Sequence, residues 1–546
     1  MKKQISSLLF FGALLLLLIG FSQCSSTETR QKNQSYPASK PTIAESANHS
    51  KISSKAPQYM ERKEKESRGV LHPDHNTEDY SVIQENSFKE VSKAPLSTFS
   101  IDVDAASYSN LRRFIQNGQK PPKDAIRIEE MVNYFDYDYP EPTGEHPLEI
   151  ITEVAACPWN AQHQLLHIGL QGKKIPTDNL PYSNLVFLID ASGSMRAPNK
   201  LPLLQASFNL LVNQLRPKDR VAIVVYAGAA GVVLPSTTGE DKQKMKEALN
   251  KLQAGGSTAG AEGIGLAYKI ARENFVKGGN NRVILATDGD FNVGPSSDAE
   301  LVRMIEKERE SGVFLTVLGF GMGNYKDNKM QELANKGNGN HAYIDNINEA
   351  KKVLVNEFGG TLFTIAKDVK FQLEFNPTKV QGYRLIGYEN RLLNDEDFND
   401  DKKDAGELGA GHTVTALYEI IPAGVKSEFL ASVDDLKYQE IKTTTAATNS
   451  KELLTVKLRY KQPDAATSQR LDLPVFAGAS TLAKASDNFR FSAAVAEFGL
   501  LLRASEYKNK ATYAQAIELA KGAKGKDVNG YRMELIKMME TREMLD

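Results

Sequence analysis

Hydroxyl and carboxylate side chains recur in this chain at the ends of apolar runs, where they could hold a metal ion. One run leads into a loop of the pattern D-x-S-x-S, a later run ends in Thr-Asp-Gly, and a small-residue loop between them carries a threonine. Mg²⁺ takes oxygen ligands in an octahedron and keeps some waters. Two carboxylates would only balance its charge, so the ion could still attract a carboxylate from another molecule. The candidate ligands for Mg²⁺, with Mn²⁺ or Ca²⁺ as alternatives, are Asp190, Ser192, Ser194, Thr258 and Asp288.

Each of these residues also has an ordinary structural explanation when it is taken alone. Asp190 follows an apolar run and could be the N-cap of a helix, and the neighbouring serines could form a serine-rich turn. A Thr-Asp-Gly sequence is likewise common where a strand ends. The metal site is therefore expected only if the three segments meet at one edge of a sheet.

The region 183–360 predicts such a sheet, because it alternates short apolar runs with helical periodicity. The runs are aliphatic or β-branched, as expected for strands covered on both faces by helices. Between them, apolar residues at 4-3-4 spacing, such as Leu204, Phe208 and Leu211, form helix stripes. We predict an α/β fold with a doubly wound, mostly parallel sheet, in which ligands bind at the carboxyl ends of the strands. The predicted strands are 185–189, 221–226, 283–286 and 314–320.

The flanks of this region alternate differently. Residues 148–154, 369–375 and 454–460 place apolar side chains at about every second position, which is typical of antiparallel strands with one wet face. Because such strands lie on both sides, we predict that the α/β region is flanked by, or inserted in, a β-rich domain. The chain then ends in helices, and Asp487 is the expected cap of the first one.

Together and in this order, the three polar segments resemble the von Willebrand factor type A (vWA) domain and its metal-ion-dependent adhesion site. All five candidate ligands match the family's metal-site positions. The stretches 97–140 and 487–503 look like the flanking regions of bacterial vWA lipoproteins, so the resemblance covers roughly residues 95 to 540. It implies binding of a protein ligand that offers a carboxylate to the metal. A domain of this fold that binds metal weakly and uses another face is the alternative.

The N-terminus predicts export and lipid anchoring. Two lysines precede an apolar run, 8–21, that is too short for a comfortable membrane span, and Cys24 follows at once. This resembles a bacterial lipoprotein signal, in which the cysteine becomes the lipidated N-terminus. The family prefers Leu where this chain has Phe21 and Gly or Ala where it has Gln23. A plain secretory signal and an uncleaved anchor are the alternatives.

Composition excludes several classes of protein. The 546 residues are 41% hydrophobic and 25% charged, which is ordinary for a folded chain and excludes a mainly disordered, collagen-like or multi-span membrane protein. The formal net charge of -1 offers no basic field for nucleic acid. Two cysteines cannot build a disulfide framework or a four-sulfur zinc site.

One enzymatic alternative comes from Ile101-Asp102-Val103-Asp104. This D-x-D is similar to the start of aspartyl-phosphate phosphatases, whose first Asp is the nucleophile. The phosphatase pattern has Thr or Val at the position that Ala106 occupies in this chain. The alternation of strands and helices expected for a parallel sheet does not follow the D-x-D. A strand followed by a helix cap at Asp104 or Ser107 is the structural alternative. The sequence contains no G-x-S-x-G, H-E-x-x-H or phosphate-loop motif.

We therefore expect a bacterial lipoprotein of the cell envelope, facing the periplasm or the surface, that is not an enzyme and binds a protein ligand through a divalent metal. An envelope enzyme, such as a metal-dependent hydrolase or phosphatase, and a scaffold with a vestigial metal site are the alternatives. The expected parts are a signal peptide (1–24), a disordered tether (25–80), an α+β flank (81–182), the vWA domain (183–360), a β-rich region (361–480) and a helical region (481–546).

Overall fold

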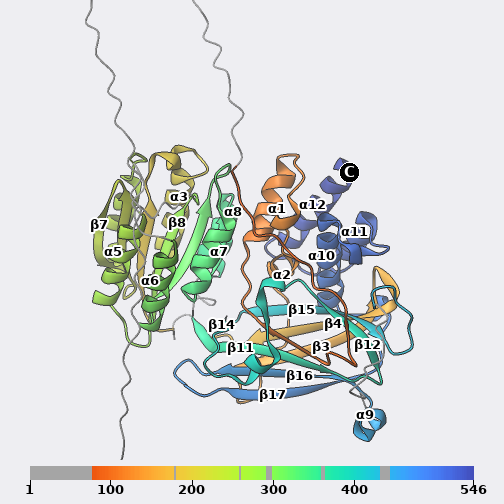
Figure 1. The fold of residues 1–546 in the computed structure, drawn as a ribbon. Coiled ribbons are helices and arrows are strands. Elements are labelled where there is room, and N and C mark those ends of the chain that lie inside the picture. Colours follow the sequence, from red (N-terminus) through yellow and green to blue (C-terminus); the bar gives the residue numbers. More distant parts are fainter. Residues whose placement is uncertain (1–76, 177–179, 257–259, 290–297, 358–362, 431–442) are drawn as a thin grey trace, which may run out of the picture. The chain divides into compact units, whose positions relative to one another are not determined.

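The computed structural model describes residues 77–176, 180–256, 260–289, 298–357, 363–430 and 443–546. Thr258, the predicted signal peptide with Cys24, and the predicted tether up to residue 76 lie outside them. Three sheets organise the described chain (Figure 1). One is the sheet of the vWA region, and the other two form a β-sandwich. No helix within these ranges is long and apolar enough to cross a membrane.

The vWA region contains a six-stranded sheet in the order β10-β9-β8-β5-β6-β7. All its strands are parallel except the edge strand β7, which pairs antiparallel with β6. The fold class predicted from the sequence is therefore confirmed. The strands are β5 (Ser183–Asp190), β6 (Arg220–Ala227), β7 (Ala229–Thr238), β8 (Asn280–Thr287), β9 (Phe314–Phe320) and β10 (His341–Ile344).

Helices cover both faces of this sheet. Alternate side chains of β5 enter opposite cores: Val186 and Leu188 pack with α5, α6 and α7, whereas Leu185 and Phe187 pack with α3, α4 and α8. This double coverage explains why the strands are apolar at consecutive positions. The helices are α3 (Leu201–Gln214), α4 (Lys242–Asn250), α5 (Gly260–Glu273), α6 (Asp298–Glu310), α7 (Asp327–Lys336) and α8 (Ile347–Lys351).

The β-sandwich is built from segments on both sides of the vWA region. Its first sheet has the order β1-β12-β15-β4-β3, its second the order β13-β2-β11-β16-β17, and β14 pairs with β11. The strands are β1 (Lys89–Glu90), β2 (Leu96–Ser100), β3 (Leu148–Cys157), β4 (Asn160–Gly172), β11 (Thr364–Phe375), β12 (Val380–Ile386), β13 (Leu392–Leu393), β14 (Gly406–Gly409), β15 (Thr413–Pro422), β16 (Glu452–Lys461) and β17 (Gln469–Phe476).

The flanking segments pair across the vWA region, as the alternation predicted. Leu166 of β4 lies opposite Tyr418 of β15, and Phe99 of β2 lies opposite Phe371 of β11. The strands around Leu148 and Val369 belong to different sheets but share one buried core. The vWA region is therefore inserted in a β-rich domain.

A helical layer covers the outer face of the first sheet. Leu165 of β4 contributes to the core under these helices, whereas its neighbour Leu166 contributes to the core between the sheets. Helix α10 begins after Ser486, whose hydroxyl accepts the Phe489 N–H, so Ser486 and not Asp487 is the cap. The helices are α1 (Ala106–Gln116), α2 (Ile128–Asn133), α10 (Asp487–Arg503), α11 (Tyr513–Gly522) and α12 (Tyr531–Leu545), and a short α9 (Thr445–Asn449) precedes β16.

Buried polar contacts join the flanks to the inserted domain. The N–H of His341, at the start of β10, donates to Asp104 Oδ1 at 2.7 Å. Arg112 of α1 forms an ion pair with Glu349 of α8 at 2.7 Å. Residues 77–80, the end of the predicted tether, are also held here, because the Thr77 N–H donates to the Gly323 carbonyl at 2.8 Å and Asp79 forms a parallel bridge with Lys326.

Candidate metal site at the carboxyl edge of the vWA sheet

The D-x-S-x-S loop begins where strand β5 ends, and Asp190 organises it. Asp190 is 0% exposed, its Oδ1 accepts the Ser192 N–H at 2.9 Å, and its Oδ2 accepts the Thr287 hydroxyl at 3.0 Å. Burial raises the pKa of Asp190, and the hydrogen bonds from Ser192 and Thr287 act against that rise. Burial therefore disfavours the charged form of this carboxylate, and a bound cation would offset that cost.

The two serine hydroxyls of the loop lie side by side. The distance from Ser192 Oγ to Ser194 Oγ is 3.0 Å, and Ser194 is exposed whereas Ser192 is buried. Two adjacent ligands of an octahedral Mg²⁺, each about 2.1 Å from the ion, are about 3 Å apart. The spacing of the two hydroxyls therefore fits neighbouring positions on one hard cation.

Asp288 follows strand β8, the neighbour of β5, and carries an internal counter-ion. Lys200 Nζ donates to Asp288 Oδ2 at 2.8 Å and to Asn324 Oδ1 at 3.1 Å. Burial alone would raise the pKa of Asp288, but the hydrogen bond and the positive charge of Lys200 outweigh it and the pKa is lowered. Lys200 thus favours the carboxylate form of Asp288.

The glycine loop ahead of Thr258 is fastened to the D-x-S-x-S loop. The Gly193 N–H donates to the Gly256 carbonyl at 3.1 Å, and the Gly255 N–H donates to the Ala191 carbonyl at 2.8 Å. Gly256 has a φ of +84°, and a Cβ there would lie 3.3 Å from the Ala227 carbonyl oxygen, so glycine suits this close approach. The loop that leads to Thr258 therefore begins beside the other candidate ligands.

The donor set fits a hard divalent cation. Four of the five candidate ligands, Asp190, Ser192, Ser194 and Asp288, belong to strand ends or loops at the carboxyl edge of adjacent parallel strands. All offer oxygen, which Mg²⁺, Mn²⁺ and Ca²⁺ prefer. Among the residues described, no three His, Cys, Asp or Glu side chains gather as in an acid-rich metal site. The candidate site depends instead on two carboxylates and on hydroxyl groups.

Lys200, Thr287 and Asn324 were not predicted from the sequence. Thr287 could have been found, because it is the first residue of the Thr-Asp-Gly segment that carries Asp288. Lys200 lies in the link between the D-x-S-x-S loop and α3, where no periodicity marks it. The aliphatic part of the Lys200 side chain packs against Gly321. At Gly321, φ is +79° and a Cβ would lie 2.4 Å from Lys200 Cε. Only glycine at 321 leaves room for the lysine.

Asp102 and Asp104, the D-x-D pair, form contacts that hold parts of the fold together. Asp102 and Asp104 both form ion pairs with Arg391, at 2.7 and 3.1 Å. Strand β2 ends at Ser100, and α1 begins after Ala105 without a side-chain cap, so neither Asp104 nor Ser107 caps the helix. The carboxyl of Asp104 instead accepts the N–H of His341 in the inserted domain.

Three family models match consecutive parts of the chain. The model described as "von Willebrand factor" matches residues 74–167, "von Willebrand factor type A domain" matches 184–355, and "Uncharacterized protein YfbK, C-terminal" matches 360–545. The three matches correspond to the N-terminal flank, the inserted domain and the C-terminal flank. They agree with the resemblance seen in the vWA segments and in the flanking stretches.

Individual relatives extend this result. The protein "Uncharacterized protein YfbK" of Escherichia coli (strain K12) is 44% identical over 492 residues, which cover 89% of this chain and 84% of that protein. A "UPF0353 protein" of Mycolicibacterium gilvum (strain PYR-GCK) is 32% identical over 149 residues, which are 25% of this chain and 44% of that protein. The solved "von Willebrand factor type A from Catenulispora acidiphila" is 17% identical, covers 74% of this chain and 92% of that one, and has a TM-score of 0.40. The high identity over both flanks and the inserted domain places the chain with the first of these, and it belongs to the YfbK family of vWA-domain proteins.

Proposed function

We propose that this protein is a lipid-anchored protein of the bacterial cell envelope whose vWA domain binds a protein ligand through a divalent metal ion. Domains of the vWA type generally mediate protein interactions. The observation that carries the metal dependence is the 3.0 Å separation of the Ser192 and Ser194 hydroxyls beside the buried Asp190 carboxylate. This is the spacing that two ligands of one octahedral ion require.

The charges around the site favour an acidic group on the partner. Asp190 and Asp288 supply two negative charges, and Lys200 cancels one of them. A bound divalent ion would therefore leave the site with a net positive charge, which attracts a carboxylate. Among the four candidate ligands that the structure describes, Ser194 is the exposed one, so the ion would be reached from its side.

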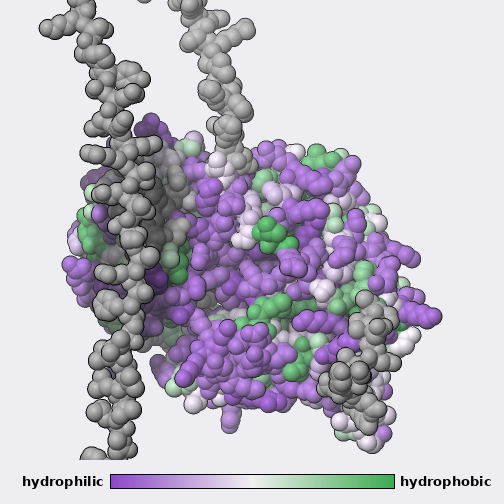
Figure 2. Space-filling model, viewed as in Figure 1, coloured by the Kyte–Doolittle hydropathy of each residue, from purple (hydrophilic) through white to green (hydrophobic). Residues whose placement is uncertain are grey.

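One face of the molecule is mainly polar. Figure 2 shows a mainly hydrophilic face on which hydrophobic residues form small, separate patches. A partner that binds this face would gain little from burying apolar area. A metal-centred contact with a carboxylate supplies specificity that does not need a large apolar surface.

A binding experiment tests the metal dependence. The full-length protein with an affinity tag, in Mg²⁺, should retain a partner from envelope extract, and excess EDTA should release it. The variant Asp190→Ala should fail to retain it under the same conditions. Retention of the same partner by Asp190→Ala, or in EDTA, would show that the protein binds through another surface.

The lipid anchor has a separate test. Mass analysis of the N-terminal peptide of the protein from membranes should show a lipid on Cys24, and Cys24→Ser should release the protein into the soluble fraction. A mature N-terminus at another residue, with the protein soluble, would contradict the anchor but leave the metal site unaffected.

A further inference from the structure

A polar cavity of about 440 Å³ lies at the amino edge of the vWA sheet, the edge opposite the candidate metal site. Arg282, the third residue of β8, lines the cavity, whereas Asp288 follows the end of the same strand. At about 3.3 Å per residue, the two ends of this strand are roughly 20 Å apart. The opposite wall comes from the β-rich domain, including β14 and the link from β2 to α1. The cavity is therefore separate from the metal site.

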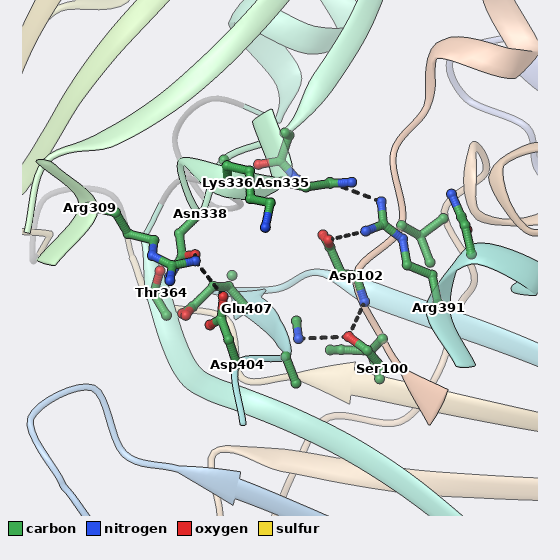
Figure 3. A pocket seen from close by; sticks show the side chains of 18 of the residues that line it. Ser100, Asp102, Arg309, Asn335, Lys336, Asn338, Thr364, Arg391, Asp404 and Glu407 are labelled. Carbon is green, nitrogen blue, oxygen red and sulfur yellow. Dashed lines mark hydrogen bonds and ion pairs between the residues drawn. The ribbon is translucent and has the colours of Figure 1, made fainter. Parts of the chain in front are cut away.

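Most charged side chains around this cavity are paired with one another. Figure 3 shows Arg309 near Asp404 on one side and Asp102 with Arg391 on the other. The Arg309–Asp404 and Arg391–Asp102 distances are 2.6 and 2.7 Å. Lys336 likewise pairs with Glu306 at 2.9 Å. Within each pair the two charges neutralise each other, and all six side chains line the cavity.

Arg282 is the cation of the cavity wall that lacks a carboxylate within ion-pair distance in the described chain. It is 3% exposed and donates to the Thr316 hydroxyl at 2.7 Å and, at 3.4 Å, to Asn280 Oδ1, both of them neutral groups. Burial lowers the pKa of Arg282 to about 10. A buried guanidinium without a counter-ion destabilises the folded protein. An anion bound beside Arg282 would therefore be stabilising.

Glu407 of β14 faces the same cavity with an unused oxygen. Its Oε2 is buried and has no hydrogen-bond partner among the residues described. Burial, together with the charges of Asp368, Asp404 and Asp102 against the opposing Lys367, raises the pKa of Glu407 to about 8. At neutral pH this carboxyl therefore carries a proton and can donate a hydrogen bond.

We propose that this cavity binds a small organic anion, through a carboxylate or phosphate group that pairs with Arg282 and accepts a hydrogen bond from Glu407. Lys403, a further cation of the lining, pairs with Asp397 at 3.4 Å, which leaves Arg282 as the cation without a carboxylate partner in the described chain, so the cavity favours an anion. Its volume is within the range of small-molecule pockets. Because Arg282 belongs to the inserted domain and Glu407 to the β-rich domain, the anion would connect the two parts of the chain.

Calorimetric titration of the full-length protein with inorganic phosphate, glycerol 3-phosphate and succinate, in EDTA, tests the proposal. We expect at least one probe to bind, and the phosphate and carboxylate arms distinguish the two chemistries. Arg282→Met should weaken that binding at least tenfold. Arg220→Met is the matched control, because Arg220 begins the parallel strand β6, donates to Ser236 and lies outside the cavity. Absence of binding by every probe, or equal binding by Arg282→Met, overturns the proposal.

A second variant keeps the test decisive if Arg282→Met does not fold. Sulfate keeps the same charge as the pH rises, so a change in its affinity comes from the titration of groups on the protein. Wild-type affinity for sulfate should fall as the pH rises past about 8, because the carboxyl of Glu407 loses its proton and repels the anion. Glu407→Gln keeps a donor at that position and should bind sulfate with little change across the same range. A parallel decline in both proteins would contradict the role of Glu407.

Discussion

Arg127 of the N-terminal flank and Asp327 of the inserted domain form a buried two-point ion pair, with Nη1–Oδ2 and Nη2–Oδ1 distances of 2.6 and 3.3 Å. Both side chains are nearly inaccessible, at 6% and 1% exposure. The same guanidinium also contacts Glu130 of α2. The position of the inserted domain on the flank is therefore fixed by charge as well as by apolar packing.

Replacing Arg127 with Met should destabilise the protein by about 3–5 kcal/mol, because Asp327 would be left buried without its cation. Urea unfolding followed by the fluorescence of Trp159, the single tryptophan, measures this change. Arg470→Met is the control: its pair with Asp472 is exposed, at 46% and 44%, so the loss should be at most about 1 kcal/mol. Equal effects of the two substitutions would contradict the structural role of the Arg127–Asp327 pair.

Removal of Asp190 should abolish Mg²⁺ binding, since this carboxylate supplies much of the attraction among neutral hydroxyl and water ligands. Ser192→Ala should weaken binding less, because a water can replace one hydroxyl oxygen. Titration calorimetry compares the Mg²⁺ and Mn²⁺ affinities of the wild type, Asp190→Ala and Ser192→Ala. An unchanged affinity in Asp190→Ala would mean that the D-x-S-x-S loop is only a hydrogen-bonded turn.

Lys200→Met should raise the affinity for Mg²⁺ roughly tenfold, because it removes a positive charge that lies 2.8 Å from Asp288 and leaves that carboxylate in need of a cation. The same calorimetric titration measures this change in Mg²⁺ affinity. Lys269→Met, at an exposed position of α5, should leave the affinity unchanged. A weaker affinity in Lys200→Met would show that the lysine orders the site rather than competing with the ion.

His167 should make the protein sensitive to acid. Its ring contacts Tyr139 Oη at 2.7 Å and Ser492 Oγ at 3.0 Å, and burial lowers its pKa to about 3. Between about pH 6.5 and pH 3 the unfolded chain binds the proton and the folded chain does not, so stability falls as the pH falls through this window. His167→Gln should reduce that slope by up to about 1.4 kcal/mol per pH unit.

Urea unfolding at a series of pH values compares the slopes. His146→Gln is the control, because His146 is partly exposed. A slope that stays the same in His167→Gln would show that other groups cause the acid sensitivity. A lower stability of His167→Gln at neutral pH does not affect this comparison, since the difference between pH values is what is measured.

The sequence predicted the sheet well where strands are apolar on both faces. Strand β9 coincides with the predicted run 314–320, and the alternation on both flanks predicted the insertion. Strand β7 was missed because Gly231 and Pro235 interrupt it and several of its side chains are exposed, and such strands are tolerated mainly at an edge.

The candidate site was predictable only in its oxygen ligands. Asp190, Ser192 and Ser194 are contiguous in sequence, so their meeting is local. The contact of Lys200 with Asp288 joins residues 88 positions apart and depends on a glycine at 321, which no local pattern reveals. Helix α10 shows the same limit: its small residues, such as Ala494 and Gly499, are also buried, because helices and sheet pack against more than its apolar stripe.

Insertion of one domain in another sets an order for folding during synthesis. The vWA sheet contains only strands between Ser183 and Ile344, so it is complete before the C-terminal flank has left the ribosome. Strand β4, made earlier, must wait for β15, which is separated from it by more than the whole length of the inserted domain. Until then the unpaired edge of β4 is open to pairing with other chains. A nascent chain that stalls after the inserted domain would thus carry a finished domain beside an unfinished, aggregation-prone sheet.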